Sequence, residues 1–217
     1  MTRPVTFETE EFYHVYNRGT EKRRIFLSKS DYARFVALLY VCNQNKPVST
    51  DFRGPTSEVF SGRSEETLVD IVAYCLMPNH FHLLVRTKES ADVGKFMQKL
   101  STGYTMYFNK RYERSGVLFQ GKFKATHVHD DEYLKYLVSY IHLNPIKLFE
   151  PKWKEVGISD RGAALKFLSD FHHSSFIDYQ GGMRAESSIL NMPLLLDYFD
   201  SPADLVVMLK SWLEYKT

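Results

Sequence analysis

The sequence contains little cysteine and no long hydrophobic run. Two cysteines occur in 217 residues, Cys42 and Cys75, and both lie inside apolar segments. Cysteines of this kind favour reduced core residues in a cytosolic protein over a disulfide framework. No apolar stretch approaches the roughly 20 residues needed to span a bilayer, and the N-terminal segment MTRPVTFETEEF has no apolar signal core. We therefore expect a cytoplasmic protein without a membrane partner.

The sequence also lacks a large excess of charge of either sign. Lys and Arg total 28 and Asp and Glu total 26, so the formal net charge of +2 does not by itself indicate nucleic-acid binding. The distribution is uneven, with six basic residues against two acids in 18–34 and seven against one in 95–124. Such stretches fit a phosphate-binding face, although either one alone is better explained by a solvated helix surface. The candidate DNA contacts are Arg18, Arg23 and Arg24, and a better patch joined by a turn, Lys110, Arg111, Arg114, Lys122 and Lys124.

The remaining composition is that of a globular protein, with 44% apolar and 25% charged residues. The length suffices for one substantial core, or for one domain with a small appendage. An aromatic content of 15% suits stacking on bases, but core packing accounts for most aromatic residues in most proteins.

Apolar periodicity and turn residues predict a β-α-β-β-α-β-α order. Pro78-Asn79 suits the centre of a tight turn, so the strands around it should form an antiparallel hairpin. Polar residues 43–67 are predicted to form a long loop within one sheet and not a domain linker. This order suggests an antiparallel or mixed sheet with helices packed on one face. The expected strands are 11–17, 68–77, 80–86 and 122–128; the expected helices are 30–42 with Ser30 as N-cap, 90–112, 132–142 capped by Asp130 or Asp131 and ended by Pro145, 161–168 and 202–215.

The predicted fold class is α+β. Residues 1–150 hold the sheet and its helices, and beyond residue 147 the pattern becomes less regular. We therefore treat residues 151–217 as a mainly helical C-terminal extension that packs on the same domain.

His80 and His82 form the first candidate constellation. On a strand, residues i and i+2 point to the same face, so these imidazoles stand side by side while Phe81 faces the other way. Two imidazoles placed in this way can share one divalent cation. The His-x-His pattern is a weak signal alone, and His127 and His129 repeat it as a rival metal pair.

Tyr140 and Asn144 form the second constellation, one turn apart on a predicted helix. Asn144 supplies a side-chain oxygen that can complete a metal shell. The same spacing also fits an apolar core stripe, in which a tyrosine only packs. Tyr104 and Tyr107 are rival nucleophiles by residue type, and His14 and Asn17 are less certain candidates for the active-site side of the first strand.

Five blocks in order carry a family resemblance. They are FYHVYNRG (12–19), MPNHFH (77–82), GVLFQGKFKA (116–125), YIHLNPIK (140–147) and SSFIDY (174–179). With them the chain, from about residue 11 to 180, resembles the REP-associated tyrosine transposases. These are a domesticated branch of the small single-tyrosine insertion-sequence transposases, within the HUH endonucleases. Five blocks in order are far more specific than any one of them.

The resemblance implies a role for each matching residue. His80 and His82 match the metal-binding pair, and Tyr140 matches the nucleophile. Asn144 occupies the position where insertion-sequence relatives usually carry a glutamine as third metal ligand, and asparagine is one methylene shorter. The implied fold is a central antiparallel sheet with flanking helices, of the ferredoxin-like HUH type.

The resemblance also implies a reaction. A Mg²⁺ or Mn²⁺ ion would assist nicking and joining of single-stranded or hairpin DNA through a 5′-phosphotyrosyl intermediate with a free 3′-OH, in a nucleoid-associated protein. Two alternatives stay open: a non-catalytic nucleic-acid-binding regulator on the same fold, and a metal-dependent hydrolase that uses water. Relatives act as dimers or as monomers, and the sequence does not decide between these states.

Overall fold

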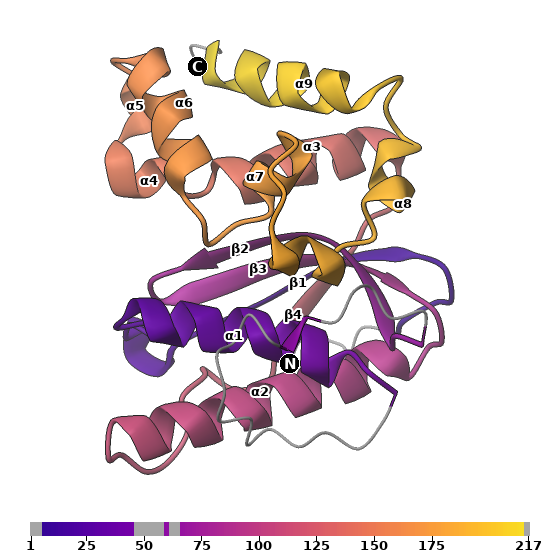
Figure 1. The fold of residues 1–217 in the computed structure, drawn as a ribbon, viewed down its shortest axis with the longest axis vertical. Coiled ribbons are helices and arrows are strands. Elements are labelled where there is room, and N and C mark those ends of the chain that lie inside the picture. Colours follow the sequence, from indigo (N-terminus) through magenta and orange to yellow (C-terminus); the bar gives the residue numbers. More distant parts are fainter. Residues whose placement is uncertain (1–5, 46–58, 61–65, 215–217) are drawn as a thin grey trace.

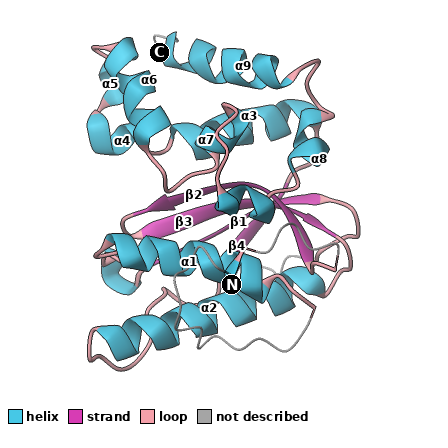
Figure 2. Cartoon of the chain, in the orientation of Figure 1, coloured by secondary structure: helices cyan, strands magenta, loops and turns pink. Residues whose placement is uncertain are grey.

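A four-stranded antiparallel sheet lies at the centre of the molecule, with helices on both of its faces (Figures 1 and 2). The computed structural model describes residues 6–45, 59–60 and 66–214. Every neighbouring pair of strands is antiparallel, which confirms the predicted fold class. The strands are β1 (Phe12–Arg18), β2 (Val69–Met77), β3 (His80–Thr87) and β4 (Lys124–His127), in the spatial order β2-β3-β1-β4.

Strands β2 and β3 form the predicted hairpin. Met77 pairs with His80 across the Pro78-Asn79 turn. All nine residues of β2 are buried, because helices cover both faces of the sheet. A strand buried on both faces is apolar along most of its length and does not alternate. The run at 68–77 has this character, with Asp70 as the exception. Our prediction that helices pack on one face only is therefore wrong.

Helices α1 (Lys29–Cys42) and α2 (Asp92–Arg111) cover one face of the sheet (Figure 1). The N-cap of α1 is Ser28 and not the predicted Ser30. The reason is Asp31, whose fully buried carboxylate accepts hydrogen bonds from the backbone N–H groups of Leu27 at 2.7 Å and Ser28 at 2.9 Å. A carboxylate at the third helical position satisfies donors that the first turn leaves unpaired, and this fixes where the helix begins.

The second face is covered by α3 (Asp131–Leu143) and by the C-terminal segment. Asp130 caps α3, since its side chain accepts a hydrogen bond from the N–H of Tyr133 at 2.7 Å. Short helices missed by the sequence patterns occupy parts of the segment between α3 and the last predicted helix. The elements are α4 (Ile146–Phe149), α5 (Trp153–Val156), α6 (Arg161–Asp170), α7 (Phe176–Tyr179), α8 (Met192–Leu196) and α9 (Pro202–Glu214), with short 3₁₀ helices η1 (Thr20–Lys22) and η3 (Ala185–Ile189).

The C-terminal segment closes the β2 edge of the sheet. The N–H of Tyr74 donates to Ser175 Oγ at 2.9 Å, and Leu190 makes a bridge with Ile71. Apolar side chains of α6, α8 and α9 share one core with α3 and β2. The domain boundary near residue 150 stays a prediction.

The end of α3 was predicted correctly, but the backbone angles of Asn144 were not. Pro145 ends α3, but Asn144 keeps helical angles (φ −54°, ψ −38°) and not the extended ones that a following proline favours, because the chain turns directly into α4. The predicted loop at 43–67 lies mostly outside the described residues, and its ends meet in a bridge between Gln44 and Thr67. Over the described ranges, no helix is long and apolar enough to cross a membrane.

Candidate active site

The two histidines of the HFH segment lie on the sheet face that carries α3. Phe81, between them, packs into the core under α1 and α2. The ring centroids of His80 and His82 are 4.9 Å apart, at an interplanar angle of 88°. In the strand register, His80 lies opposite Arg18 and His82 opposite Tyr16. Directly opposed residues share a face, so β1 contributes to the same surface.

Hydrogen bonding defines the tautomer of His80. Its Nδ1 lies 2.7 Å from Oδ1 of Asn79, while Nδ2 of Asn79 donates to the backbone oxygen of Lys22 at 3.3 Å. Because an amide oxygen can only accept, Nδ1 of His80 carries the hydrogen. Its Nε2 therefore keeps a lone pair that is available to a cation.

His82 is held by a third histidine. Its Nδ1 lies 2.8 Å from Nε2 of His14, on the neighbouring strand β1. His82 is buried, and among the described residues its Nε2 has no hydrogen-bond partner. An unpaired nitrogen at such depth is costly unless a ligand satisfies it, which marks this atom as a metal-ligand candidate.

The environment keeps these imidazoles neutral. Burial lowers the pKa of His80 to about 4, helped by the positive charges of Lys147 and Arg18 and partly offset by the polar amide of Asn144 nearby. Burial also lowers the pKa of His14 to about 4 and holds that of His82 well below its ordinary value. Neutral imidazoles are the form that binds metals.

Tyr140 faces this histidine cluster from α3. Its ring meets His82 edge-on at a centroid distance of 5.4 Å and His14 at 6.1 Å. The half-buried ring lines a cavity of about 320 Å³ together with His14, Tyr16 and His82. The helix thus turns its apolar residues into the core and presents Tyr140 to the sheet.

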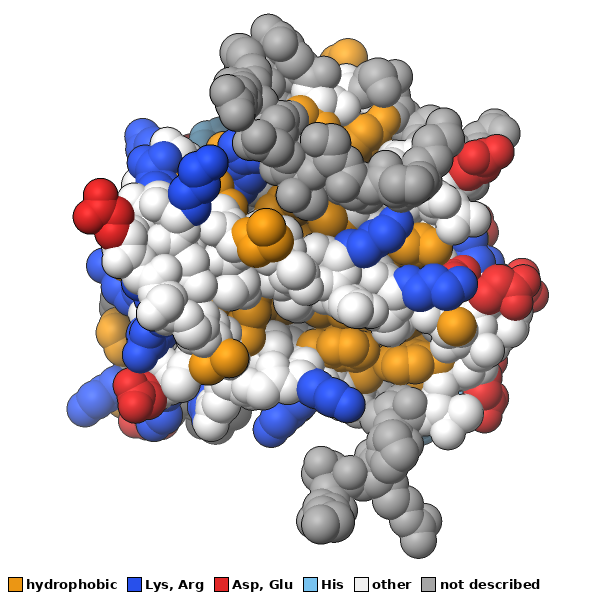
Figure 3. All heavy atoms as spheres, turned by 90° about the horizontal axis from the view of Figure 1, so that it is seen from below, with side chains coloured by type: hydrophobic (Ala, Val, Ile, Leu, Met, Phe, Trp, Pro, Cys, Tyr) orange, Lys and Arg blue, Asp and Glu red, His pale blue; other side chains and the backbone are white. Residues whose placement is uncertain are grey.

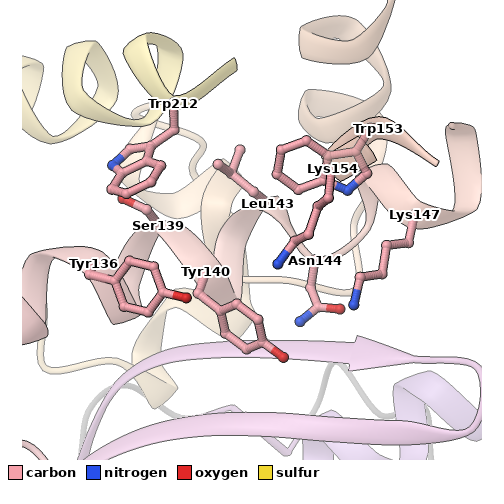
Figure 4. A pocket seen from close by; sticks show the side chains of 9 residues that line it. All are labelled: Tyr136, Ser139, Tyr140, Leu143, Asn144, Lys147, Trp153, Lys154 and Trp212. Carbon is pink, nitrogen blue, oxygen red and sulfur yellow. The ribbon is translucent and has the colours of Figure 1, made fainter. Parts of the chain in front are cut away.

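Asn144 lies one turn beyond Tyr140 and is almost fully buried at 3% exposure. Neither polar atom of its side chain has a hydrogen-bond partner within the described part of the chain. In Figure 4 the side chains of Tyr140, Asn144 and Lys147 all point toward the sheet. An unsatisfied buried amide beside two neutral imidazoles has the donor set that a divalent cation can use.

The described residues contain no group of three His, Cys, Asp or Glu side chains arranged to hold a metal. A metal at this site would therefore need the Asn144 amide oxygen, or oxygens from a substrate, besides His80 and His82. The rival pair is separated: His127 ends β4 and bonds Glu11 at 3.0 Å, whereas His129 lies beyond the strand and bonds Asp130 at 3.0 Å.

The rival tyrosines lie on the other side of the sheet. Tyr104 is fully buried in the α1–α2 core and donates to the backbone oxygen of Ile25. Tyr107 donates to Asp31 at 3.0 Å, and burial together with that carboxylate raises its pKa to about 12. Neither tyrosine contacts the histidine cluster.

The predicted DNA-contacting residues are divided between two faces. Arg18 lies opposite His80, and Lys124 lies opposite Tyr16, so both border the cluster. Arg111 instead pairs with Asp31 at 3.5 Å on the α1–α2 side, where lysine and arginine side chains are scattered among apolar ones (Figure 3). The other predicted DNA contacts lie in the connectors or at the end of α2. Arg23 pairs with Glu21, Arg114 bonds Asn109, and Arg24, Lys110 and Lys122 have no role assigned by the structure.

Two cationic side chains near the histidine cluster were not predicted from the sequence. Lys147 in α4 is close enough to depress the pKa values of His80 and His82. Lys154 in α5 places its Nζ 5.2 Å from the centre of the Tyr140 ring. Lys147 belongs to the YIHLNPIK block, which was a usable signal; nothing in the sequence around Lys154 predicts that α5 folds back over Tyr140.

Comparisons with known proteins identify the family and the fold. A Haemophilus influenzae protein named as a REP-associated tyrosine transposase is 28% identical over 116 residues, which span 48% of this chain and 65% of that protein. A solved structure of a REP-associated tyrosine transposase bound to a REP hairpin shares the fold, with a TM-score of 0.55 at 12% identity over 83% of this chain and 86% of the other. The family model "Transposase IS200 like" matches residues 31–144, slightly more than half of the chain, and ends on Asn144. The chain therefore belongs to the IS200-like transposase family.

Proposed function

We propose that this chain nicks and rejoins single-stranded DNA beside hairpin-forming repeats, with Tyr140 as the nucleophile. One observation carries the proposal. Tyr140 on α3 and the His80–His82 pair on β3, about 60 residues apart in sequence, meet with Tyr140 and His82 ring centroids 5.4 Å apart. Family membership supports a DNA-processing activity. The hairpin bound to the structurally similar transposase supports a structured single strand as substrate.

His80, His82 and Asn144 would hold a divalent cation, Mg²⁺ or Mn²⁺. The fit rests on Nε2 of His82 and the Asn144 amide, which are buried and lack partners among the described residues. A mixed nitrogen and oxygen donor set suits Mn²⁺ somewhat better than Mg²⁺. When bound, such an ion supplies charge stabilisation to the oxygens of the phosphate under attack.

The chemistry of Tyr140 is an exchange of phosphodiester bonds. Its phenolic oxygen forms a bond to phosphorus while the bond from phosphorus to the 3′ oxygen breaks. The phenolic proton passes to solvent and the released 3′ oxygen takes one up, which leaves a free 3′-OH and a 5′-phosphotyrosyl link. Because one phosphoester replaces another, the reverse attack by a 3′-OH rejoins a strand without ATP.

Positive charge around Tyr140 suits a DNA backbone. Lys147 and Arg18 lie close enough to His80 to lower its pKa. Lys154 places its Nζ against the Tyr140 ring, and Lys124 pairs with Tyr16 on the neighbouring strand. Lysine and arginine are the usual partners of phosphate oxygens. With this function the protein would act at the nucleoid in the cytoplasm, as a monomer or as a homodimer.

A covalent-adduct assay tests the proposal. The protein is mixed with labelled hairpin-containing single strands and Mn²⁺, and products are separated on a denaturing gel. We expect an adduct that requires metal and disappears in Tyr140→Phe, while DNA binding by that variant stays within about threefold of the parent. Tyr133→Phe, on the same helix, is the matched control and should keep the adduct.

Each competing activity would give a different pattern of products on the gel. A hydrolase that uses water would cut the strand without forming an adduct. A regulator would bind but neither cut nor respond to EDTA. An adduct that persists in Tyr140→Phe would remove Tyr140 as nucleophile.

A further inference from the structure

A second cavity lies on the other side of Tyr140. It has a volume of about 220 Å³ and is lined by residues of α3, α4, α5 and α9 (Figure 4). The side chains of Tyr136 and Tyr140 line this cavity and also the one that contains the histidines. The two spaces are therefore neighbours, with the proposed nucleophile in the wall between them.

Aromatic and apolar side chains form most of the cavity wall. Trp153 from α5 and Trp212 from α9 face it, and Leu143 forms part of its wall on α3. The chain has two tryptophans, so both line this one cavity. Its volume lies below the roughly 300–1,000 Å³ of pockets for drug-sized ligands, which favours a single planar ring system as occupant. Aromatic side chains in such places stack on nucleic-acid bases with little regard to sequence.

Two buried polar groups in the cavity wall lack a hydrogen-bond partner among the described residues. The Nε1 of Trp153 is buried and, over the residues the structure describes, makes no hydrogen bond. The Nδ2 of Asn144, whose oxygen is the proposed metal ligand, makes none either. A buried donor or acceptor without a partner is destabilising. A heterocycle with donors and acceptors along its edge can satisfy such groups, whereas an alkyl ligand cannot.

The positive charges at the cavity favour a ring that is attached to phosphate groups. Lys147 and Lys154 both line it, and their ammonium groups point toward Tyr140 and Asn144 in Figure 4. The two cations repel each other, and this repulsion, after burial, lowers the pKa of Lys154. Phosphate groups on either side of a bound ring would offset that repulsion.

We propose that this cavity binds one unpaired, unstacked nucleobase of the DNA strand, next to the phosphate that Tyr140 attacks. The inference rests on the proposed function, because it needs a single strand running past Tyr140. A base inside a duplex cannot enter such a cavity without leaving the stack. The site would thus select single-stranded over paired DNA and set which phosphate reaches Tyr140.

Tryptophan fluorescence reports on the cavity without requiring cleavage. The full-length Tyr140→Phe protein is titrated with two ten-nucleotide probes: oligothymidylate, and a strand of the same length in which every nucleotide is abasic. The two probes carry the same phosphates, so they differ in the bases alone. We expect quenching by oligothymidylate and little quenching by the abasic strand.

Substitution at Trp212 separates base binding from phosphate binding. Trp212→Ala should weaken oligothymidylate binding about 5- to 160-fold, the range of base–aromatic stacking, and change binding of the abasic strand less than twofold. Trp212→Phe should restore most of the affinity. Phe149→Ala, which truncates an exposed ring on α4 outside the cavity, is the matched control and should change neither affinity. Trp153→Phe provides a second test if Trp212→Ala does not fold.

The outcomes distinguish the two proposals. Equal weakening of both probes by Trp212→Ala, equal quenching by both, or binding of neither would overturn the base-binding cavity. If the parent protein forms the adduct but shows no base-dependent quenching, the proposal of base binding is wrong and that of strand cleavage stands. If quenching depends on the bases but no adduct forms, base binding is supported and the proposal of strand cleavage is wrong.

Discussion

Nε2 of His14 lies 2.8 Å from Nδ1 of His82, across the β1–β3 strand pair. Both rings are buried and burial keeps both of them neutral, so one ring donates the hydrogen and the other accepts it. When His82 is the donor, its Nε2 is left with a lone pair facing the cavity. His14 then orients His82 in the way that a hydrogen-bond acceptor orients metal-binding histidines in general.

Removing the acceptor from His14 should weaken metal binding. His14→Phe keeps a planar ring between Tyr16 and His82 but cannot accept the hydrogen. We expect Mn²⁺ affinity, measured by isothermal titration calorimetry, to fall about 10- to 100-fold. His14→Gln, which retains an acceptor, should lose less than His14→Phe. Unchanged affinity in His14→Phe would show that His14 only packs against His82.

Asn144 offers a second test of the metal site. Its amide is buried beside His80 and has no partner in the described residues, so a bound cation is the simplest use for its oxygen. Asn144→Ala should lower Mn²⁺ affinity about tenfold or more, whereas Asn144→Asp should raise it, because a carboxylate is the stronger ligand for hard divalent cations. Loss of DNA binding with unaltered Mn²⁺ affinity in Asn144→Ala would assign the amide to DNA instead.

Local patterns predicted the sheet and the histidine pair well. The alternation in HFHLLVR places His80 and His82 on one face, and the Pro78-Asn79 turn fixes the β2–β3 pairing. These features depend on residues close together in the sequence. The helix of Tyr140 was also predicted, since its apolar period and the Asp130 cap are local signals.

Features set by distant contacts were not predictable in this way. The Ser28 cap depends on what surrounds Asp31, whose other partners are Tyr107 and Arg111 on α2 and Tyr112 directly after it. The short helices between α3 and α9 form where the chain packs on the second face of the sheet, and α4 and α5 are each four residues long. Helices of that length have little intrinsic stability and form through tertiary packing. Lys154 and Trp212 reach Tyr140 only through this packing.

A half-buried histidine away from the site gives a pH-dependent prediction. The ring of His173 stacks on Tyr32 at a centroid distance of 3.7 Å and an angle of 7°. Burial lowers the pKa of His173 to about 4, with further lowering by the positive charges of His172, Arg184 and Lys29. In the unfolded chain a histidine titrates near 6.5. Between these values the unfolded chain takes up a proton at this residue and the folded protein does not.

The free energy of unfolding should therefore fall as the pH decreases from about 6.5 to 4. His173 contributes a slope of up to about 1.4 kcal/mol per pH unit in that window and none above it. His173→Phe keeps the stack on Tyr32 but removes the titration, so its slope should be smaller by that amount. Urea denaturation followed by circular dichroism at pH 7, 6 and 5, with EDTA present, measures both slopes. The other buried histidines titrate in both proteins and cancel in the comparison, so parallel slopes would mean that His173 is protonated as readily in the folded protein as in the unfolded chain.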